Sequence, residues 1–314
     1  MSSAAATAHS FNKILALPKL ASKHRTTADI DEAIKKLRRL ILVEGIPSAI
    51  DPTLRPRIWK ILLGLGPDDI PADLFLYYVG RGPCEVREKI RNDTFRTLAT
   101  DRGFKERVRE DMLVRLLDAF VWRSQDRPEQ ALGFTYVQGM NVLAAPFLYT
   151  LPSEVEAFFC FAKFIEESCP LYVQPTLEGV HRGLKLLDRC LKIVDPELYA
   201  YLRSKRLSAE IYAFPSVLTL CACTPPLDQV LQLWDFLLAF GVHLNILCVI
   251  AQLLLIRDDV MACPSPMRML RTFPPLDAQP VIGIAVTLVR DLPPELYDEL
   301  VRHPYELRGN EGGR

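Results

Sequence analysis

Two polar residues of this sequence carry side chains that are suited to assisting a reaction. Gln138 lies between Tyr136 and Gly139 in otherwise apolar sequence, and Arg96 ends a charged segment that begins at Ile90. A guanidinium spreads positive charge over phosphate oxygens, and a carboxamide both donates and accepts hydrogen bonds, so it can orient a water molecule. Neither group is a nucleophile or an acid–base catalyst at neutral pH. The pair can therefore assist phosphoryl transfer but cannot carry it out unaided.

Residue chemistry leaves a structural role open for both side chains. Arg96 can be an ordinary surface cation, and Gln138 can be an amide that caps a neighbouring helix. The types of these two residues do not separate this reading from the catalytic one.

Sequence motifs for other chemistries are absent. The chain has no G-x-x-x-x-G-K-[ST] or G-x-G-x-x-G loop, so we expect no nucleotide site of its own. It also lacks a G-x-S-x-G nucleophile elbow and an H-E-x-x-H metal helix. Its five histidines stand isolated in the sequence.

Composition predicts a globular protein without a global charge preference. The chain has 314 residues with 49% hydrophobic content, enough to bury a large core in one extended domain or two tightly joined subdomains. Its 38 basic residues balance 38 acidic ones, which disfavours a nucleic-acid partner or an anionic membrane. Charge-based recognition must therefore be local.

The eight cysteines have no regular spacing and lie mostly in apolar runs. They are typical of small buried hydrophobes in a reducing compartment. The nearest metal motif, Cys221-Ala222-Cys223, is one residue too short for C-x-x-C, so we expect no metal site.

Both ends of the chain are predicted to be mobile. The first 28 residues contain no Asp or Glu and are rich in Ser, Ala and Thr, a composition faintly like that of a transit peptide. A mobile tail over residues 1–30 is the preferred interpretation, and residues 304–314 are assigned to a second tail.

Hydrophobic periodicity predicts an all-α protein. Residues 66–83 hold several prolines and glycines and are expected to form an irregular connection, and residues 216–223 are a strand only as a minority interpretation. Ile90, Phe95 and Leu98 are the expected apolar positions of a charged helix that is entered near residue 84. Other helices are expected from about Asp31 to Gly45, over 54–64 and 104–122, after a capping box at Ser153, and at about 177–194, 196–205, 209–223, 227–240, 243–258, 278–291 and 295–302.

The apolar segment 236–256 is long enough to cross a bilayer. Gly241, His243, Asn245 and Gln252 interrupt it, so a buried helical hairpin is favoured over a membrane span.

Three short motifs together resemble the signatures of the TBC domain family. They are Arg55-Pro56-x-x-Trp59, Ile90-x-x-Asp93-x-x-Arg96 and Tyr136-x-Gln138-Gly139-Met140, in the order that the family shows. Gly45-Ile46-Pro47 resembles the family's entry loop, and Leu231 to Asp235 followed by Gly241 resembles a later segment. The resemblance covers residues 31–303 and implies a single all-helical domain.

The resemblance also implies an activity and roles for individual residues. TBC domains accelerate GTP hydrolysis on small Rab-like GTPases with an arginine and a glutamine finger, which would be Arg96 and Gln138. Asp93 would hold the arginine segment, and Tyr136 and Gly139 would shape the glutamine loop. Structural roles are implied for Arg57, Trp59, Trp234 and Asp235. The protein would need no cofactor of its own, because GTP and Mg²⁺ belong to the partner GTPase.

The wording of the motifs is similar to that of the mitotic-checkpoint TBC proteins of fungi. This narrower resemblance implies a scaffold-like partner subunit in a two-component complex, a GTPase of mitotic exit or septation, and a cytoplasmic place at spindle pole bodies. A non-catalytic TBC module that sequesters or localises a GTPase is the alternative function.

Overall fold

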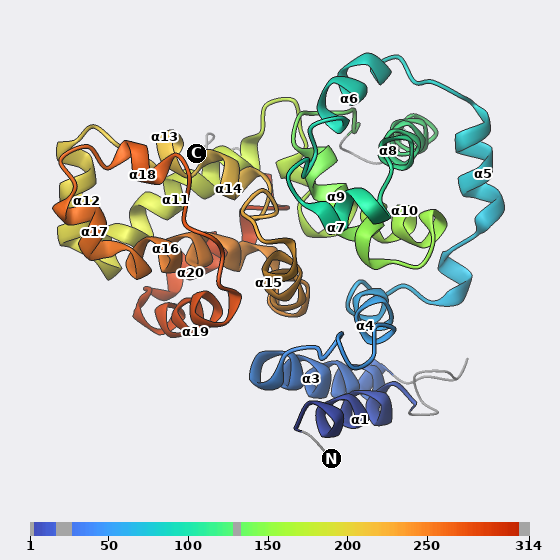
Figure 1. Cartoon of the computed structure of the whole chain (residues 1–314), viewed down its shortest axis with the longest axis horizontal. Coiled ribbons are helices and arrows are strands. Elements are labelled where there is room, and N and C mark those ends of the chain that lie inside the picture. Colours follow the sequence, from blue (N-terminus) through green and yellow to red (C-terminus); the bar gives the residue numbers. More distant parts are fainter. Residues whose placement is uncertain (1–2, 17–26, 128–132, 308–314) are drawn as a thin grey trace, which may run out of the picture.

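The computed structural model of this protein describes residues 3–16, 27–127 and 133–307. Helices are its only regular elements within those ranges (Figure 1). The first half of the chain forms α4 (Leu54–Leu62), α5 (Ala72–Gly80), α6 (Arg87–Thr94), α7 (Arg102–Arg107), α8 (Glu110–Gln125), α9 (Met140–Thr150) and α10 (Glu154–Lys163). The second half forms α11 (Glu178–Val194), α12 (Pro196–Ser204), α13 (Ala209–Tyr212), α14 (Phe214–Leu218), α15 (Leu227–Phe240), α16 (Asn245–Leu255), α17 (Arg257–Ala262), α18 (Met267–Leu270), α19 (Ala278–Leu288) and α20 (Pro294–Arg302).

The two halves lie side by side and share one core. Figure 1 shows α5 to α10 on the right, α11 to α14 and α16 to α20 on the left, and α15 between them. Trp234 on α15 packs against the first half, with ring centroids 5.6 Å from Phe147 on α9 and 5.3 Å from Phe164 just after α10. Edge-to-face and tilted aromatic pairs at these separations are attractive beyond their buried area. The prediction of an all-α domain made of two tightly joined helical subdomains is confirmed.

Several helix ends follow local sequence signals. Ser153 caps α10, because its hydroxyl accepts a 3.2 Å hydrogen bond from the Glu156 amide, as the capping box predicts. Gly241 ends α15 with φ +117°, a backbone conformation that side chains with a Cβ rarely adopt. The turn at Gly241 separates α15 from α16, which confirms the buried hairpin. In the described ranges, the structure contains no helix of the length and apolarity that crossing a membrane requires.

The predicted irregular connection over residues 66–83 is wrong, because α5 (Ala72–Gly80) occupies half of it. Phe75 and Tyr78 are buried on one side of α5, and this tertiary packing outweighs the nearby prolines and glycines. The helix expected over 104–122 is divided into α7 and α8. Asp101 caps α7 by accepting a 2.7 Å hydrogen bond from the Phe104 amide, and the backbone at Val108 is extended.

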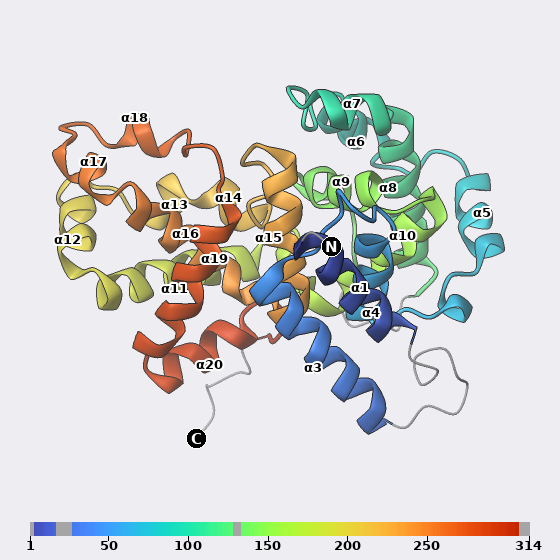
Figure 2. The same cartoon turned by 60° about the horizontal axis from the view of Figure 1, so that its bottom comes forward.

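The N-terminal segment is a helix, so the prediction of a mobile tail is wrong for residues 3–15. α1 (Ser3–Leu15) packs on α3 (Thr27–Glu44), as Figure 2 shows, and Phe11 is fully buried. The Ala-rich composition that suggested disorder also favours a helix once one apolar face finds a partner. α3 begins at Thr27, four residues before the start that was expected at about Asp31. Residues 1–2 and 17–26 lie outside the described residues.

At the other end, the folded part extends past the predicted boundary at residue 303. Pro304 is buried, and its carbonyl accepts a 3.0 Å hydrogen bond from the Leu171 amide. Residues 305–307 are exposed, and residues 308–314 lie outside the described part of the chain.

Candidate functional site

Arg96 and Gln138 line the same cavity, although 41 intervening residues separate them in the sequence. Arg96 follows the last turn of α6, and Gln138 lies in the loop that leads into α9. The cavity has a volume of about 500 Å³, and its opposite wall comes from α14 and the start of α15, including Leu218 and Leu227. The structure therefore brings together the two residues that the sequence singled out.

Arg96 is anchored at one end and exposed at the other. Its Nη2 donates a 2.5 Å hydrogen bond to Oδ1 of Asp93, one helical turn earlier. The Arg96 side chain is 56% exposed, while that of Asp93 is 10% exposed. Because a guanidinium carries five N–H groups in a planar fork, Asp93 fixes its direction and leaves most donors for another group. The expected role of Asp93 as the residue that holds Arg96 agrees with this geometry.

Tyr136 connects the glutamine loop to the arginine segment. Its hydroxyl donates a 2.7 Å hydrogen bond to Oδ2 of Asp93, so one carboxylate receives both Arg96 and Tyr136. Burial, with the adjacent Asp93 carboxylate, raises the pKa of the Tyr136 phenol well above its usual range, and the phenol keeps its proton. Asp93 therefore links the two segments through charge-assisted hydrogen bonds.

Asn141 and Thr97 form a second buried link between the same two segments. Nδ2 of Asn141 donates a 2.8 Å hydrogen bond to Oγ1 of Thr97, and Oδ1 of Asn141 accepts from the Gly139 amide at 3.2 Å. Thr97 in turn donates to the Asp93 carbonyl at 3.1 Å. Asn141 and Thr97 are 4% and 5% exposed, so breaking these bonds leaves buried polar groups unpaired. We call Asp93, Thr97, Tyr136 and Asn141 the finger-base network.

Gly139 places Gln138 at the cavity wall. Its φ of +106° lies in the left-handed region, and a Cβ there would lie 3.0 Å from Cδ2 of Leu218 on α14. Glycine is thus required both for the backbone conformation and for the close approach of α14. Gln138 itself is exposed, and its amide has no hydrogen-bond partner within the described ranges.

Three of the residues expected to be structural, Trp59, Trp234 and Asp235, lie at or beside a buried ion pair between Arg55 and Asp235. Arg55 donates to both oxygens of Asp235 at 2.9 Å, and Trp59 Nε1 donates to Oδ1 of Asp235 at 2.7 Å. Burial raises the pKa of Asp235, and these donors act in the opposite direction. Trp234 is buried and donates a 3.0 Å hydrogen bond to the Leu220 carbonyl. Trp59, Trp234 and Asp235 therefore hold α4 to α15.

Arg57 lies elsewhere than the other residues of this group. Its Nη1 donates a 2.9 Å hydrogen bond to Oδ1 of Asn12 on α1, so it attaches the N-terminal helix. Of the two arginines that flank Pro56, Arg55 is the one that pairs with Asp235. Arg57 thus contacts α1 and not α15, because residues two positions apart on a helix point in different directions.

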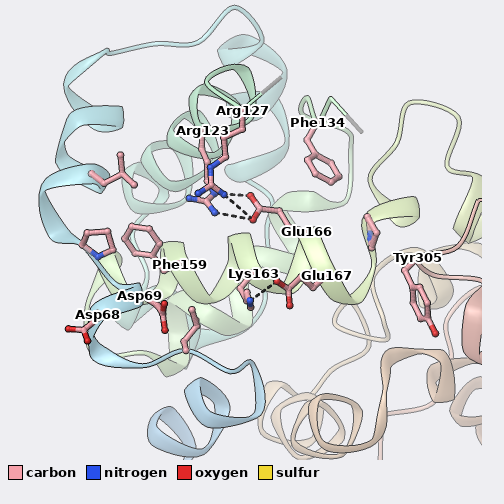
Figure 3. A pocket seen from close by; sticks show the side chains of 14 residues that line it. Asp68, Asp69, Arg123, Arg127, Phe134, Phe159, Lys163, Glu166, Glu167 and Tyr305 are labelled. Carbon is pink, nitrogen blue, oxygen red and sulfur yellow. Dashed lines mark hydrogen bonds and ion pairs between the residues drawn. The ribbon is translucent and has the colours of Figure 1, made fainter. Parts of the chain in front are cut away.

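A larger cavity of about 720 Å³, lined mostly by residues of the first half and also by Tyr305, lacks both Arg96 and Gln138. Figure 3 shows its cations turned toward carboxylates. Arg123 lies 2.7 Å and Arg127 3.8 Å from Glu166, and Lys163 lies 2.5 Å from Glu167. Its cations are thus already paired within the fold, and the smaller cavity is the better candidate site.

The finger-base network contains two residues that the sequence did not identify. Thr97 and Asn141 follow directly on the two motifs, and Asn141 is polar at the start of an apolar helix. A polar residue at such a position is a usable signal, since buried polar groups need partners. The sequence cannot name the partner, because the hydrogen bond joins segments 44 residues apart.

The family model of the Rab-GTPase-TBC domain matches residues 52–261. The chain belongs to this family. Among its relatives, Cell division control protein 16 of Schizosaccharomyces pombe is 47% identical over 92% of this chain and 94% of its own length. Mitotic check point protein BUB2 of Saccharomyces cerevisiae is 42% identical over 87% of this chain and 92% of its own length.

Solved structures agree on the fold. The Ypt/Rab-GAP domain of Gyp1p superposes with a TM-score of 0.72 at 18% identity, covering 91% of this chain and 98% of that one. The Chlamydomonas flagellar RabGAP TBC domain gives a TM-score of 0.61 at 18% identity, covering 98% of this chain and 96% of that one.

Proposed function

We propose that this protein accelerates GTP hydrolysis by a small Ras/Rab-like GTPase, with Arg96 and Gln138 as the two residues that it inserts into the GTPase's nucleotide site. One observation carries the proposal. Both side chains are exposed at the wall of one cavity, while the residues beneath them are buried and hydrogen-bonded to one another. Membership of the Rab-GTPase-TBC family supports a small GTPase as the partner.

Arg96 stabilises negative charge. The transferred phosphoryl group spreads its charge over its equatorial oxygens, and a guanidinium that donates to them lowers the barrier. The bond to Asp93 keeps the guanidinium in one direction, so less side-chain entropy is lost when the GTPase binds. The GTPase supplies GTP and Mg²⁺.

Gln138 orients the attacking water. Its amide oxygen accepts a hydrogen bond from the water and its amide nitrogen donates to the phosphate, which a carboxamide does without changing protonation. Because the glutamine comes from this protein, the reaction does not depend on the GTPase's own water-positioning glutamine. No independent catalysis is expected of this protein without a GTPase.

Single-turnover hydrolysis on a panel of GTP-loaded GTPases tests the proposal. Arg96→Ala should lower the maximum rate by about 10³- to 10⁵-fold, which is ~4 to 7 kcal/mol of transition-state stabilisation. Arg102→Ala is the matched control, because Arg102 is 91% exposed and its partner among the described residues is the exposed Glu106, one turn later on α7. Gln138→Ala should also lower the maximum rate of GTP hydrolysis. A GTPase that lacks its own catalytic glutamine should still be activated by the wild-type chain.

The non-catalytic alternative predicts another outcome. If Arg96→Ala and Gln138→Ala variants keep the wild-type rate, or if wild-type protein accelerates no GTPase that it binds, the catalytic proposal is overturned. Retention of the complex in those variants would then favour a module that sequesters or localises the GTPase.

The relatives named for cell division control and the mitotic check point support a cellular setting for the proposal. In that setting the GTPase acts in mitotic exit or septation, and a scaffold-like subunit binds this chain at the spindle pole body. Co-purification from dividing cells, with fluorescence imaging of the tagged chain, tests this part. Recovery of the chain alone and diffuse fluorescence through mitosis would contradict it.

A further inference from the structure

Phe95, the residue before Arg96, is exposed although the sequence pattern predicted it to be an apolar position of its helix. Its exposed fraction is 65%. All fifteen phenylalanines of the chain lie in the described ranges, and the others are buried or half-buried. Ile90, on the same helical segment, is fully buried as predicted. The fold therefore uses Ile90 and leaves Phe95 in solvent.

The position of Phe95 does not depend on its own side chain. The last turn of α6 is held by Asp93, Thr94 and Thr97, which are 7%, 3% and 5% exposed. The backbone of Phe95 is helical, with φ −61° and ψ −27°, so no strain is stored there. An alanine at residue 95 should leave the fold intact.

Arg91 lies one helical turn before Phe95 on the same exposed face of α6. Within the described ranges its guanidinium has no ion-pair partner. Lys89 is a second exposed cation on α6, and Glu88 is the only exposed carboxylate on that helix. Phe95 thus follows a helix that exposes two cations and one carboxylate.

We infer that Arg91 and Phe95, the α6 patch, form a recognition surface for the GTPase. This inference rests on the proposed function. A GTPase whose phosphates reach Arg96 lies near the end of α6. Phe95 directly precedes Arg96 there and Arg91 is about one helical turn of 5.4 Å further along, and both lie outside the cavity lining, on the surface next to it. A standard interface covers about 800 Å² on each partner, so it extends well beyond two fingers.

The chemistry of the patch defines the complementary surface. Phe95 suits an apolar hollow on the GTPase, and Arg91 suits a carboxylate at the edge of that hollow. Large aromatic and arginine side chains dominate binding energy at such places when the partner desolvates them. Neither residue of the α6 patch touches the reacting phosphate, so their role is affinity and specificity.

The expected effect is on binding and not on the chemical step. Phe95→Ala should raise the concentration of this protein that gives the half-maximal rate by about ten- to a hundred-fold, the range for full burial of such a side chain. The maximum single-turnover rate should stay within about two-fold of wild type, because the lost contact stabilises the bound ground state and the transition state equally. Arg91→Glu should weaken binding most at low salt.

The experiment uses the full chain and the GTPase of the panel that wild-type protein activates most. Rates are measured against protein concentration for wild type, Phe95→Ala, Arg91→Glu and two controls. Val43→Ala removes an apolar side chain of similar exposure, 66%, from α3, and Lys192→Glu reverses an exposed charge on α11. Thermal unfolding of each variant shows whether it is folded.

The possible outcomes separate this inference from the proposed function. A raised half-maximal concentration at a preserved maximum rate, in the α6-patch variants but not in the controls, supports the patch. If the curves for Phe95→Ala and Arg91→Glu coincide with that of wild type, while Arg96→Ala and Gln138→Ala still lose activation, the inference about the α6 patch is overturned and the proposed function is not. A fall in maximum rate alone also overturns it. If wild-type protein activates no GTPase, the proposed function and this inference are both overturned.

Discussion

The phenol of Tyr136 donates a 2.7 Å hydrogen bond to Asp93, the same carboxylate that Arg96 pairs with at 2.5 Å. The loop that carries Gln138 and the segment that carries Arg96 are thus held together by one buried acid. Preorganised donors need no rearrangement at the moment of reaction, which is where much of their catalytic value lies. The finger-base network joins the segments that carry Arg96 and Gln138 within this chain alone.

Tyr136→Phe tests this link, because it removes one hydroxyl and keeps the ring. We expect the maximum rate of GTP hydrolysis in the presence of this variant to be about three- to thirty-fold lower. A hydrogen bond to a charged group contributes about 1.5–3 kcal/mol, and only part of that free energy is lost from the transition state. Single-turnover hydrolysis and urea unfolding measure the two effects. A variant with wild-type rate at saturating protein would contradict the role assigned to Tyr136.

Arg96→Lys tests whether the planar guanidinium is needed or whether a positive charge at residue 96 suffices. Lysine keeps the positive charge, but its ammonium cannot both pair with Asp93 and present a planar pair of donors to phosphate oxygens. The variant should therefore retain less than about a hundredth of the wild-type maximum rate. Recovery of more than half of that rate would mean that charge alone suffices.

Gly139→Ala should destabilise the protein by about 1–3 kcal/mol, because the residue has φ +106° and the new Cβ meets Leu218 at 3.0 Å. Gly80→Ala is the control, since a Cβ at residue 80 meets nothing within 4 Å and φ there is not positive. Chemical denaturation compares the two. Equal stability of both variants would show that the loop accommodates a side chain.

Removing Arg55 should cost more than removing Arg57, although the two flank the same proline. Arg55→Ala leaves Asp235 buried without its cation, at about 3–5 kcal/mol, whereas Arg57→Ala loses a bond to the neutral Asn12, at about 1 kcal/mol. Free energies of unfolding from urea titration measure both. The reverse order would refute the placement of the ion pair.

Acid should unfold the protein through two buried histidines. Burial lowers the pKa of His243 to about 4 and that of His303 to about 3, so the folded state keeps both neutral. The unfolded chain takes up their protons below its ordinary pKa of about 6.5, so stability is full above that pH and falls as pH drops toward 4. Each histidine should cost about 2 kcal/mol by pH 5. In urea titrations at pH 7.5 and 5, a His243→Gln variant should lose about 2 kcal/mol less than wild type.

Much of the fold follows from local signals, and its failures have a common cause. The cap at Ser153 and the end at Gly241 are determined by neighbouring residues, and the sequence places both correctly. α1 and α5 were missed because their burial depends on distant partners. The exposure of Phe95 was missed for the same reason, since periodicity describes a face but not what covers it.

The site shows the same division. The resemblance of three short motifs identified Arg96 and Gln138 before any geometry was known, and the structure places them on one cavity. Thr97 and Asn141 could not be paired from the sequence, because their hydrogen bond depends on how two segments meet. Arg55 and Arg57 could be distinguished only when the faces of α4 were known.

The contrast between exposed fingers and a buried network has an evolutionary consequence. Within the described residues the side chain of Gln138 makes no hydrogen bond and that of Arg96 makes only the one to Asp93, whereas Asp93, Tyr136 and Asn141 each leave an unpaired buried group when changed. A gene copy released from selection for activity can lose both fingers and still encode a folded GTPase-binding protein. Within such lineages, the two surface residues would distinguish active proteins from inactive ones, while the buried residues would stay the same in both.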